Sequence, residues 1–293
     1  MAARIIDGKQ VAHDIRAELK KETAQLKEQG IVPGLGVILV GEDPASQSYV
    51  TAKERACAET GLYSDDNRLP ADTTQADLVA LIQNMNADPK IHGILVQLPL
   101  PKHLNEAEAL LTIDPAKDVD GFHPVNVGRM VLGEKAFLPC TPHGVIQLLA
   151  RSGVTIAGAH AVVVGRSNIV GKPLANMLLQ KKENANATVT VCHTGTADIA
   201  YHTRQADIVI VAAGRPNTLT ADMVKDGATV IDVGVNRVED ASRKSGFRLV
   251  GDVDFEAIKD KASLITPVPG GVGPMTIAML LYNTVESAKR AMA

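Results

Sequence analysis

The chain has 293 residues, of which 45% are hydrophobic and 22% charged, and its formal net charge is −3. This length favours two domains, and the composition is ordinary for a globular protein. The small negative charge excludes a general nucleic-acid binder, and an aromatic content of 3% without Trp argues against base-stacking platforms. The N-terminus has no apolar signal core and no apolar run reaches membrane-spanning length. We therefore expect a cytoplasmic protein that engages neither nucleic acid nor membrane.

The cysteines indicate neither a disulfide framework nor a zinc site. There are three, Cys57, Cys140 and Cys192, and they are far apart in the sequence. None forms a Cys-x-x-Cys pair, and the number is odd. We expect reduced structural thiols and no bound metal.

The first half of the chain alternates helical patterns with short apolar strands. Its β-α-α-β order implies parallel strands within an α/β layer sandwich. The predicted elements are, in order, an amphipathic helix over 8–29, a buried strand over 35–40, a helix from Asp43-Pro44 to Gly61, a helix over 73–87, and a buried strand over 93–101.

The second of these helices carries Tyr49 and Lys53, four residues apart. On a helix this spacing places both side chains on one face, about 6 Å apart along the axis and rotated by roughly 40°. A Lys beside an aromatic ring and apolar strands loses solvation and proton affinity, so that it can act as an acid or base near neutral pH. The alternative is a half-buried ring next to a solvated amine.

Two polar positions stand near the end of the second strand and in the loop that follows. Gln97 interrupts an apolar run where the strand ends, and parallel sheets bind ligands at the carboxyl ends of their strands. The alternative for Gln97 is a hydrogen bond to loop backbone. Asp118 and Asp120 resemble the start of a calcium loop, but the downstream ligands are missing, so calcium is rejected. Asp120 is better explained as an acidic side chain that binds a planar amide-like group through two bonds, and Asp118 as an Asx-turn residue.

From about residue 139 the pattern becomes a strict strand–helix alternation. This alternation predicts a doubly wound, Rossmann-like domain. The charge-rich stretch 236–248 indicates an exposed hairpin or loop. The predicted strands are 161–165, 188–192, 208–212, 229–235 and 264–265, and the predicted helices are 142–153, one that ends at Gln180, 196–205, 220–225 and 275–291.

A glycine-bounded turn from Gly165 to Gly171 follows the first of these strands. Such a turn directs backbone N–H groups and a helix N-terminus at a pyrophosphate, although Ser167 replaces the second glycine of the usual fingerprint and a purely structural turn is the alternative. Arg166 adds positive charge, and the next strand ends near Thr194 without the acidic residue that holds a ribose diol. We therefore predict NADP rather than NAD. Val235, at another strand tip, is a candidate contact to the nicotinamide ribose.

Five ordered motifs together resemble one family, the bifunctional methylenetetrahydrofolate dehydrogenase/cyclohydrolases of one-carbon metabolism. The resemblance covers nearly the whole chain. The motifs are Ser48-Tyr49-Val50-x-x-Lys53, Gln97-Leu98-Pro99-Leu100-Pro101, Asp118-Val119-Asp120-Gly121-Phe122, Gly165-Arg166-Ser167-x-Ile169-Val170-Gly171-x-Pro173, and Pro267-Val268-Pro269-Gly270-Gly271-Val272-Gly273-Pro274-Met275-Thr276.

The resemblance implies a two-domain α/β fold with both substrates in a cleft between the domains, and a homodimer. A catalytic, folate-binding domain is expected over 1–139 together with the C-terminal helix 275–293, and a Rossmann-like NADP-binding domain with a parallel sheet over 140–274. The implied reactions are NADP-dependent oxidation of 5,10-methylenetetrahydrofolate to the methenyl form, then hydrolysis to 10-formyltetrahydrofolate, a one-carbon donor for purine biosynthesis.

The resemblance also implies roles for individual residues. Lys53 corresponds to the catalytic lysine, Tyr49 to its partner that stacks on the folate, Gln97 to the residue that tunes the lysine, and Asp120 to the pterin anchor. The folate pocket is further implied to include Leu98, Pro99, Pro269 and Gly270. The cofactor is implied to contact Gly165, Arg166, Ser167, Ile169, Thr194, Val235, Gly271 and Thr276.

Three other functions stay open at this point. One is a monofunctional dehydrogenase, which the presence of Lys53 and Gln97 disfavours. A second is a non-catalytic NADP-binding protein. A third is another two-domain NADP oxidoreductase, acting for example on shikimate, which the Pro-Gly-Gly-Val-Gly-Pro segment and the Tyr49/Lys53 pair disfavour.

Overall fold

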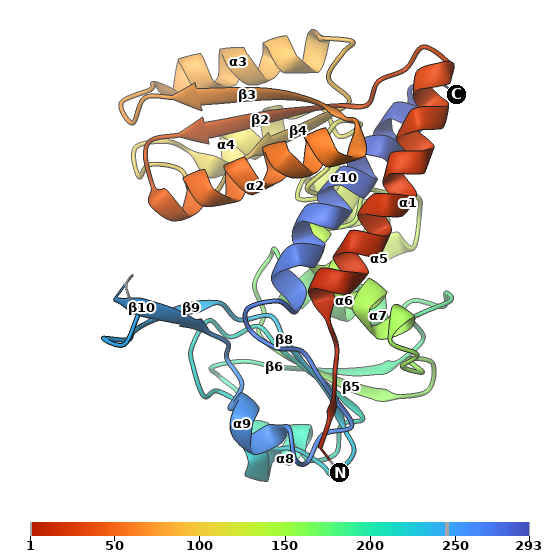
Figure 1. The fold of residues 1–293 in the computed structure, drawn as a ribbon, viewed down its shortest axis with the longest axis vertical. Coiled ribbons are helices and arrows are strands. Elements are labelled where there is room, and N and C mark those ends of the chain that lie inside the picture. Colours follow the sequence, from red (N-terminus) through yellow and green to blue (C-terminus); the bar gives the residue numbers. More distant parts are fainter. Residues whose placement is uncertain (1, 244–245, 293) are drawn as a thin grey trace. The chain divides into compact units, whose positions relative to one another are not determined.

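A computed structural model describes residues 2–243 and 246–292 (Figure 1). It divides into two compact units. The first consists of Met1–Ala12 and Thr141–Thr276, and the second of His13–Cys140 and Ile277–Ala293.

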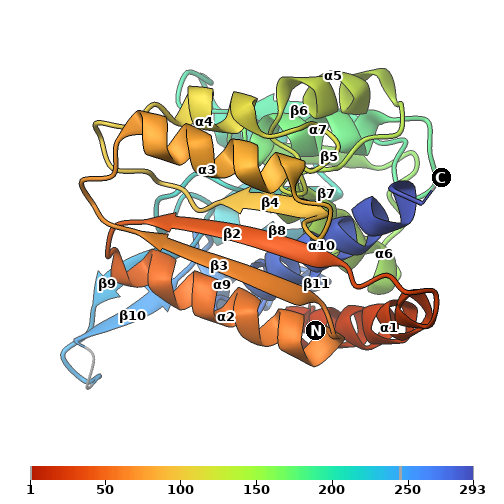
Figure 2. The same ribbon diagram turned by 90° about the horizontal axis from the view of Figure 1, so that it is seen from above.

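The second unit contains a three-stranded parallel sheet in the order β3-β2-β4 (Figure 2). The central strand β2 (Gly34–Val40) is buried along its whole length, as its continuous apolar sequence predicts. On one face, Ile38 and Ile94 pack against Leu78 and Ile82 of α3. Figure 1 shows α2 on the opposite side of the sheet from α3. The flanking elements are β4 (Gly93–Val96), α2 (Pro44–Thr60), α3 (Gln75–Ala87), α4 (Glu106–Thr112) and α5 (Pro124–Leu132).

The edge strand β3 (Tyr63–Leu69) was not predicted. Its sequence, YSDDNRL, is polar and it is partly exposed along most of its length, so neither a buried run nor a clear alternation marks it. It pairs in parallel with β2 from Gly34↔Tyr63 to Val40↔Leu69. Backbone pairing to a buried neighbour thus makes a strand where side-chain patterning gives no signal.

The C-terminal part of α10 (Val272–Arg290) belongs to this second unit and is tied to its loops by buried polar side chains. Asn283 Nδ2 donates to the carbonyls of Val119 (2.8 Å) and Leu138 (3.0 Å). Ser287 Oγ donates to the carbonyls of His92 (2.6 Å) and Ala116 (2.9 Å). These bonds satisfy loop carbonyls that lie outside the sheet ladder.

The first unit contains a six-stranded parallel sheet in the order β1-β11-β8-β7-β5-β6, which confirms the doubly wound prediction. The chain runs from β5 outward to β6 and then returns to β7 on the other side of β5. The topological switch point therefore lies between β5 and β7, where folds of this kind bind their ligands. The strands are β1 (Arg4–Ile5), β5 (His160–Val164), β6 (Thr188–Cys192), β7 (Ile208–Val211), β8 (Thr229–Asp232) and β11 (Leu264–Ile265).

Most helices of this unit fall where the sequence predicts them, with shifted bounds. These are α6 (Cys140–Arg151), α7 (Gly171–Leu179) and α8 (Ile199–Thr203), with a single 3-10 turn at Ala221–Met223 in place of the predicted short helix. The short helix α9 (Phe255–Ile258) was not predicted. The charge-rich stretch forms the antiparallel hairpin β9 (Asn236–Glu239) and β10 (Phe247–Val250).

The N-terminus differs from the predicted domain bounds. Residues 1–12 group with the six-stranded sheet rather than with the first half of the chain. The reason is that Arg4 and Ile5 of β1 pair in parallel with Leu264 and Ile265 of β11. The sequence did not predict this strand, because it is only two residues long and its partner lies about 260 residues later in the chain. Among the described residues, no helix is both long and apolar enough to cross a membrane.

Candidate active site

The helix that carries Tyr49 and Lys53 is capped as predicted. Asp43 accepts the N–H of Ser46 at 2.8 Å, and Pro44 occupies the first turn. Gly61 ends the helix in the left-handed region, with φ at +78°. The structure contradicts the alternative in which the Lys53 amine is solvated. Lys53 is 7% exposed, whereas Tyr49 is 44% exposed. The amine is therefore the buried group, and the ring is accessible.

Lys53 meets Gln97 directly. The Lys53 Nζ atom donates to Gln97 Oε1 at 2.8 Å, and Gln97 Nε2 donates to the carbonyl of Leu98 at 2.7 Å. The backbone N–H of Gln97 donates to Ile38 O at 2.8 Å, which anchors the residue to β2 just past the end of β4. The next peptide bond, Leu98–Pro99, is cis. The predicted hydrogen bond of Gln97 to loop backbone is confirmed, and the oxygen of the same side chain accepts from Lys53.

Asp118 organises the loop that contains Asp120. Its two carboxylate oxygens accept the backbone N–H groups of Gly121 (3.1 Å), Phe122 (3.2 Å) and His123 (2.8 Å), and Asn126 Nδ2 at 2.9 Å. Asp118 is 1% exposed, so four donors satisfy a buried carboxylate. The predicted turn role of Asp118 is confirmed.

Asp120 is electrostatically coupled to Lys53. Burial raises the pKa of the Asp120 carboxyl to about 6, although the positive charge of Lys53 opposes this shift, and the nearby Asp118 carboxylate adds to it. Burial likewise lowers the pKa of the Lys53 ammonium, while Asp120, Cys140 and Cys57 oppose that change. Burial therefore moves the pKa values of the amine and of the carboxyl toward each other, a pattern that is frequent at functional sites.

Cys140 is a member of this cluster that the sequence did not single out as functional. Its thiol donates to the carbonyl of Val119 at 3.3 Å and lies 3.8 Å from Asn283 Nδ2. Burial and the neighbouring Asp120 raise the pKa of the Cys140 thiol well above its ordinary value, so it stays protonated. A single Cys at the start of a helix carries no pattern by which the sequence could identify it. Burial raises the pKa of Cys57 to about 12, and no disulfide joins these described cysteines.

The predicted cofactor turn lies in the other unit, after β5. Gly165 has φ at +138°, and a Cβ on it would lie 2.3 Å from the carbonyl oxygen of Ala212, just beyond β7. A Cβ on Gly171 would lie 2.2 Å from the carbonyl oxygen of Gly165. Ser167 Oγ accepts the N–H groups of Val170 (3.1 Å) and Gly171 (3.4 Å), which orders the turn in place of a second glycine. The two glycines allow the close backbone approach at the switch point.

The sheet register brings Arg166 and Thr194 to one edge. Val164 pairs with Cys192, and Gly165 N donates to Cys192 O at 2.8 Å. Arg166 stands two residues after Val164, and Thr194 stands two residues after Cys192. Both Arg166 and Thr194 are exposed. A guanidinium and a hydroxyl at the end of parallel strands suit a phosphate monoester.

The remaining predicted residues also lie in the first unit or at its border. Val235 is exposed beyond β8, and Ile169 is exposed in the cofactor turn. Thr276 Oγ1 lies 2.8 Å from Thr141 Oγ1. Pro269 and Gly270, predicted for the folate pocket, belong to this unit rather than to that of Lys53. Pro269 follows a cis bond, Gly270 has φ at +105°, and a Cβ on Gly271 would lie 2.6 Å from Pro267 O.

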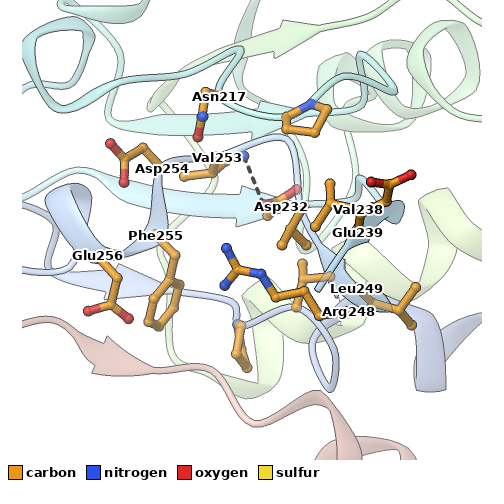
Figure 3. Close-up of a pocket in the computed structure, with 15 residues that line it drawn as sticks. Asn217, Asp232, Val238, Glu239, Arg248, Leu249, Val253, Asp254, Phe255 and Glu256 are labelled. Carbon is orange, nitrogen blue, oxygen red and sulfur yellow. Dashed lines mark hydrogen bonds between the residues drawn. The ribbon is translucent and has the colours of Figure 1, made fainter. Parts of the chain in front are cut away.

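A cavity of about 560 Å³ opens beside the β9–β10 hairpin of the same unit (Figure 3). Its walls include Asp232, Arg248 and Phe255, and no residue that the sequence predicts for a site. Among the described residues, no group of three or more His, Cys, Asp or Glu side chains is arranged to hold a metal ion.

Comparison with known proteins gives consistent similarities over the full length. Residues 6–120 match the family domain described as "Tetrahydrofolate dehydrogenase/cyclohydrolase, catalytic domain", and residues 139–292 match its "NAD(P)-binding domain". The chain is 61% identical to the "Bifunctional protein FolD" of Syntrophus aciditrophicus, covering 99% of this chain and 98% of that protein. It is 59% identical to the protein of the same name from Moorella thermoacetica, covering 99% and 100%.

Two solved structures share the fold closely. The bifunctional FolD dehydrogenase/cyclohydrolase of Campylobacter jejuni is 54% identical, with a TM-score of 0.93 and coverage of 99% of this chain and 100% of that one. The Trypanosoma brucei dehydrogenase-cyclohydrolase, solved with NADP and an inhibitor, is 44% identical, with a TM-score of 0.94 and coverage of 100% and 99%.

Proposed function

The chain belongs to the tetrahydrofolate dehydrogenase/cyclohydrolase family, and on that premise we propose how its residues carry the two reactions. The protein is a bifunctional enzyme that oxidises 5,10-methylenetetrahydrofolate with NADP and hydrolyses the 5,10-methenyl product to 10-formyltetrahydrofolate. Tetrahydrofolate derivatives are its substrates.

The residues of the Gly165 turn fit NADP. The tight approach at Gly165 leaves backbone at the switch point close to a ligand, and α7 begins at Gly171 with its N-terminus toward the turn. We assign Gly165, Ser167 and Ile169 to the pyrophosphate side, with Arg166 and Thr194 at the 2′-phosphate. When bound, NADP accepts the hydride that leaves the methylene carbon. Val235, Gly271 and Thr276 are assigned to the nicotinamide side of this site.

The folate substrate is assigned to the unit of Lys53. The exposed ring of Tyr49 offers a stacking face for a pterin or aminobenzoyl ring. The Asp120 carboxyl can take two hydrogen bonds from the pterin amide edge. Leu98 and Pro99 supply apolar contacts on a segment fixed by the cis bond. For Pro269 and Gly270, which belong to the other unit, the family resemblance is the support for a place in the folate pocket.

Hydrolysis begins with water attack on the cationic methenyl carbon. We assign the neutral Lys53 amine as the base: it takes a proton from the attacking water as the C–O bond forms, and becomes an ammonium. It then returns that proton to the ring nitrogen as the C–N bond breaks, and takes up the hydroxyl proton as the C=O bond forms. Release of this second proton to solvent restores the neutral amine and leaves the formyl group on the other nitrogen. Gln97 holds the amine in place throughout, and Asp120 stabilises the ammonium form.

The observation that carries these assignments is the hydrogen bond of the buried Lys53 amine to Gln97, next to an ionisable Asp120. It provides a buried amine, with its pKa lowered by burial, in place of a solvated surface ammonium. The test is to mix the enzyme with methylenetetrahydrofolate and NADP and to record NADPH and methenyl absorbance together. NADPH formation with little methenyl accumulation supports a coupled enzyme, whereas stoichiometric methenyl accumulation would show that hydrolysis is absent.

We further propose a homodimer in the cytoplasm. The family resemblance supports the dimer, and three buried free thiols suit a reducing compartment. Light scattering coupled to size exclusion tests the dimer: a mass near 62 kDa, twice the chain mass of 31.0 kDa, is expected, and a mass of one chain contradicts it.

A further inference from the structure

Two buried carboxylates in the first unit take no part in the reactions assigned above. Asp232 ends β8 and is 3% exposed, and Asp252 lies beyond β10 and is 0% exposed. Buried Asp side chains are rare unless they are fully hydrogen-bonded. Both lie at the carboxyl edge of the six-stranded sheet, where ligands of such folds bind.

Asp252 fixes the segment that follows β7. Its Oδ2 atom accepts the N–H groups of Ala213 (2.7 Å) and Gly214 (2.8 Å). These residues come directly after Ala212, whose carbonyl oxygen crowds Gly165 at the switch point. Its Oδ1 atom accepts Asn236 Nδ2 at 2.8 Å, at the start of β9. One side chain thus holds the loops after β7 and β8.

Asp232 joins the same loops from the other side. Its Oδ1 atom accepts the N–H groups of Gly234 (3.0 Å) and Asp252 (2.9 Å), and its Oδ2 atom accepts that of Val253 at 3.0 Å (Figure 3). Its own N–H donates to Thr266 Oγ1 at 2.7 Å, where the loop toward Gly271 and α10 begins.

Two glycines make this packing possible. A Cβ on Gly251 would lie 1.7 Å from Asp232 Oδ2, and a Cβ on Gly234 would lie 2.2 Å from Asp252 Oδ1. No side chain other than hydrogen fits at either position while the carboxylates keep their bonds. The sequence therefore builds the two carboxylates into the backbone of these loops.

We propose that Asp232 and Asp252 are positioning residues for the dehydrogenase reaction. They act through the backbone of residues 213–214, 234–236 and 266, which contains Val235 and leads toward Gly271, two residues assigned to the nicotinamide side of the cofactor site. Val235 lies between Gly234, tied to Asp232, and Asn236, tied to Asp252. This inference rests on the proposed function, because it presumes that NADP binds at this sheet edge.

The test compares the two activities in Asp252→Asn and Asp232→Asn. In each variant one carboxylate oxygen becomes an NH2 group, which cannot accept a hydrogen bond. The backbone N–H groups that this oxygen accepted then lose their acceptor, and we expect the loops that carry them to move. We expect the KM for NADP to rise at least about 10-fold while kcat/KM for hydrolysis of methenyltetrahydrofolate stays within about 2-fold. Asp226→Asn, which changes a carboxylate that is 90% exposed in the same unit, is the matched control and should leave both unchanged.

Three outcomes are distinguishable. A wild-type enzyme that forms no NADPH defeats the proposed function itself. An active wild type with an unchanged KM for NADP in both folded variants overturns the inference, as does an equal loss of both activities, which would mark a merely structural role. If the Asp variants do not fold, Asn236→Ala decides, since it removes the Nδ2 donor to Asp252 Oδ1 (2.8 Å) and to the carbonyl of Gly251 (3.2 Å) and leaves both carboxylates in place. A rise of about 3-fold or more in the KM for NADP supports the inference, and no rise overturns it.

Discussion

Lys53 and Gln97 meet through a hydrogen bond of 2.8 Å between Nζ and Oε1. The lysine comes from the middle of α2 and the glutamine from the end of β4, 44 residues later in the chain. Since Gln97 is itself fixed to β2 and to Leu98, the amine is held by the sheet rather than by its own flexible stem. A base that is positioned before the substrate arrives loses little entropy in the reaction.

The first prediction concerns Gln97→Ala. The Gln97 oxygen accepts from the amine and stabilises its ammonium form, so its loss lowers the pKa of Lys53 further and frees the side chain. Both activities should fall, hydrolysis by at least about 10-fold. The rising limb of the pH–rate profile for hydrolysis should move to lower pH. Identical limbs in wild type and variant would contradict the coupling between the two residues.

The second prediction concerns the pH dependence of stability in Asp120→Asn. Burial raises the pKa of Asp120 from its ordinary value of 3.8 to about 6. Between these values the unfolded chain is ionised while the folded chain keeps its proton, so this group's contribution to the free energy of unfolding falls as pH rises. The amide that replaces the carboxyl does not ionise, so the variant does not lose this part of the free energy of unfolding as the pH rises. Urea unfolding should show the stability of the variant relative to wild type rising from pH 4 to pH 6 and levelling off above pH 7.

A relative stability that is flat from pH 4 to pH 7 would show that Asp120 titrates near its ordinary value. Asp114→Asn serves as the control, because Asp114 is an exposed acid in the same unit that accepts a hydrogen bond from Ala116 N.

The third prediction concerns Asp118→Asn. The variant keeps one acceptor oxygen in place of two, while four donors still point at the side chain. We expect the free energy of unfolding to fall by about 2–3 kcal/mol and the KM for folate substrate to rise, because Asp120 sits in the loop that Asp118 orders. Chemical denaturation and initial-rate kinetics measure both. Asp114→Asn should cost less than about 0.5 kcal/mol, and an equal effect in the two variants would remove the special role of Asp118.

The fourth prediction concerns cofactor choice. Arg166 lies at the edge of β5 in register with Thr194, and no acidic residue stands at the tip of β6. Arg166→Ser should raise the KM for NADP by at least about 10-fold, since charge-assisted hydrogen bonds to a phosphate are lost, and should leave the KM for NAD nearly unchanged. Lys182→Ser is the control. It removes an exposed cation from the same unit as Arg166 and should change neither the KM for NADP nor the KM for NAD. Equal effects of Arg166→Ser on both cofactors would place Arg166 away from the 2′-phosphate.

Much of this architecture was predictable because it rests on local patterns. Buried apolar runs identify β2, β4, β5 and β7, and the Asp43-Pro44 cap with Gly61 sets the bounds of α2. The four-residue spacing of Tyr49 and Lys53 placed them on one helix. That the amine is buried and the ring exposed was not predictable, because burial depends on what packs against the helix.

Contacts distant in sequence account for what was missed. The polar strand β3 pairs with β2, and the two-residue strand β1 pairs with β11. The sequences of β3 and β1 themselves show no strand pattern. Cys140 joins Asp120 only through the fold of the loop between them. In the sequence, Asp232 and Asp252 are indistinguishable from exposed polar residues. Only the structure shows that their carboxylates occupy the space that a Cβ on Gly251 or Gly234 would need.

Lys53→Met gives the most direct test of the central claim, that one buried amine is the base of hydrolysis. Methionine keeps the length of the apolar stem without the proton acceptor. Wild type and variant are each supplied with methylenetetrahydrofolate and NADP, and NADPH and methenyl absorbance are followed together. We predict that the variant still forms NADPH, accumulates the methenyl compound and hydrolyses it at least about 100-fold more slowly than wild type. Hydrolysis of methenyltetrahydrofolate at the wild-type rate would contradict the account.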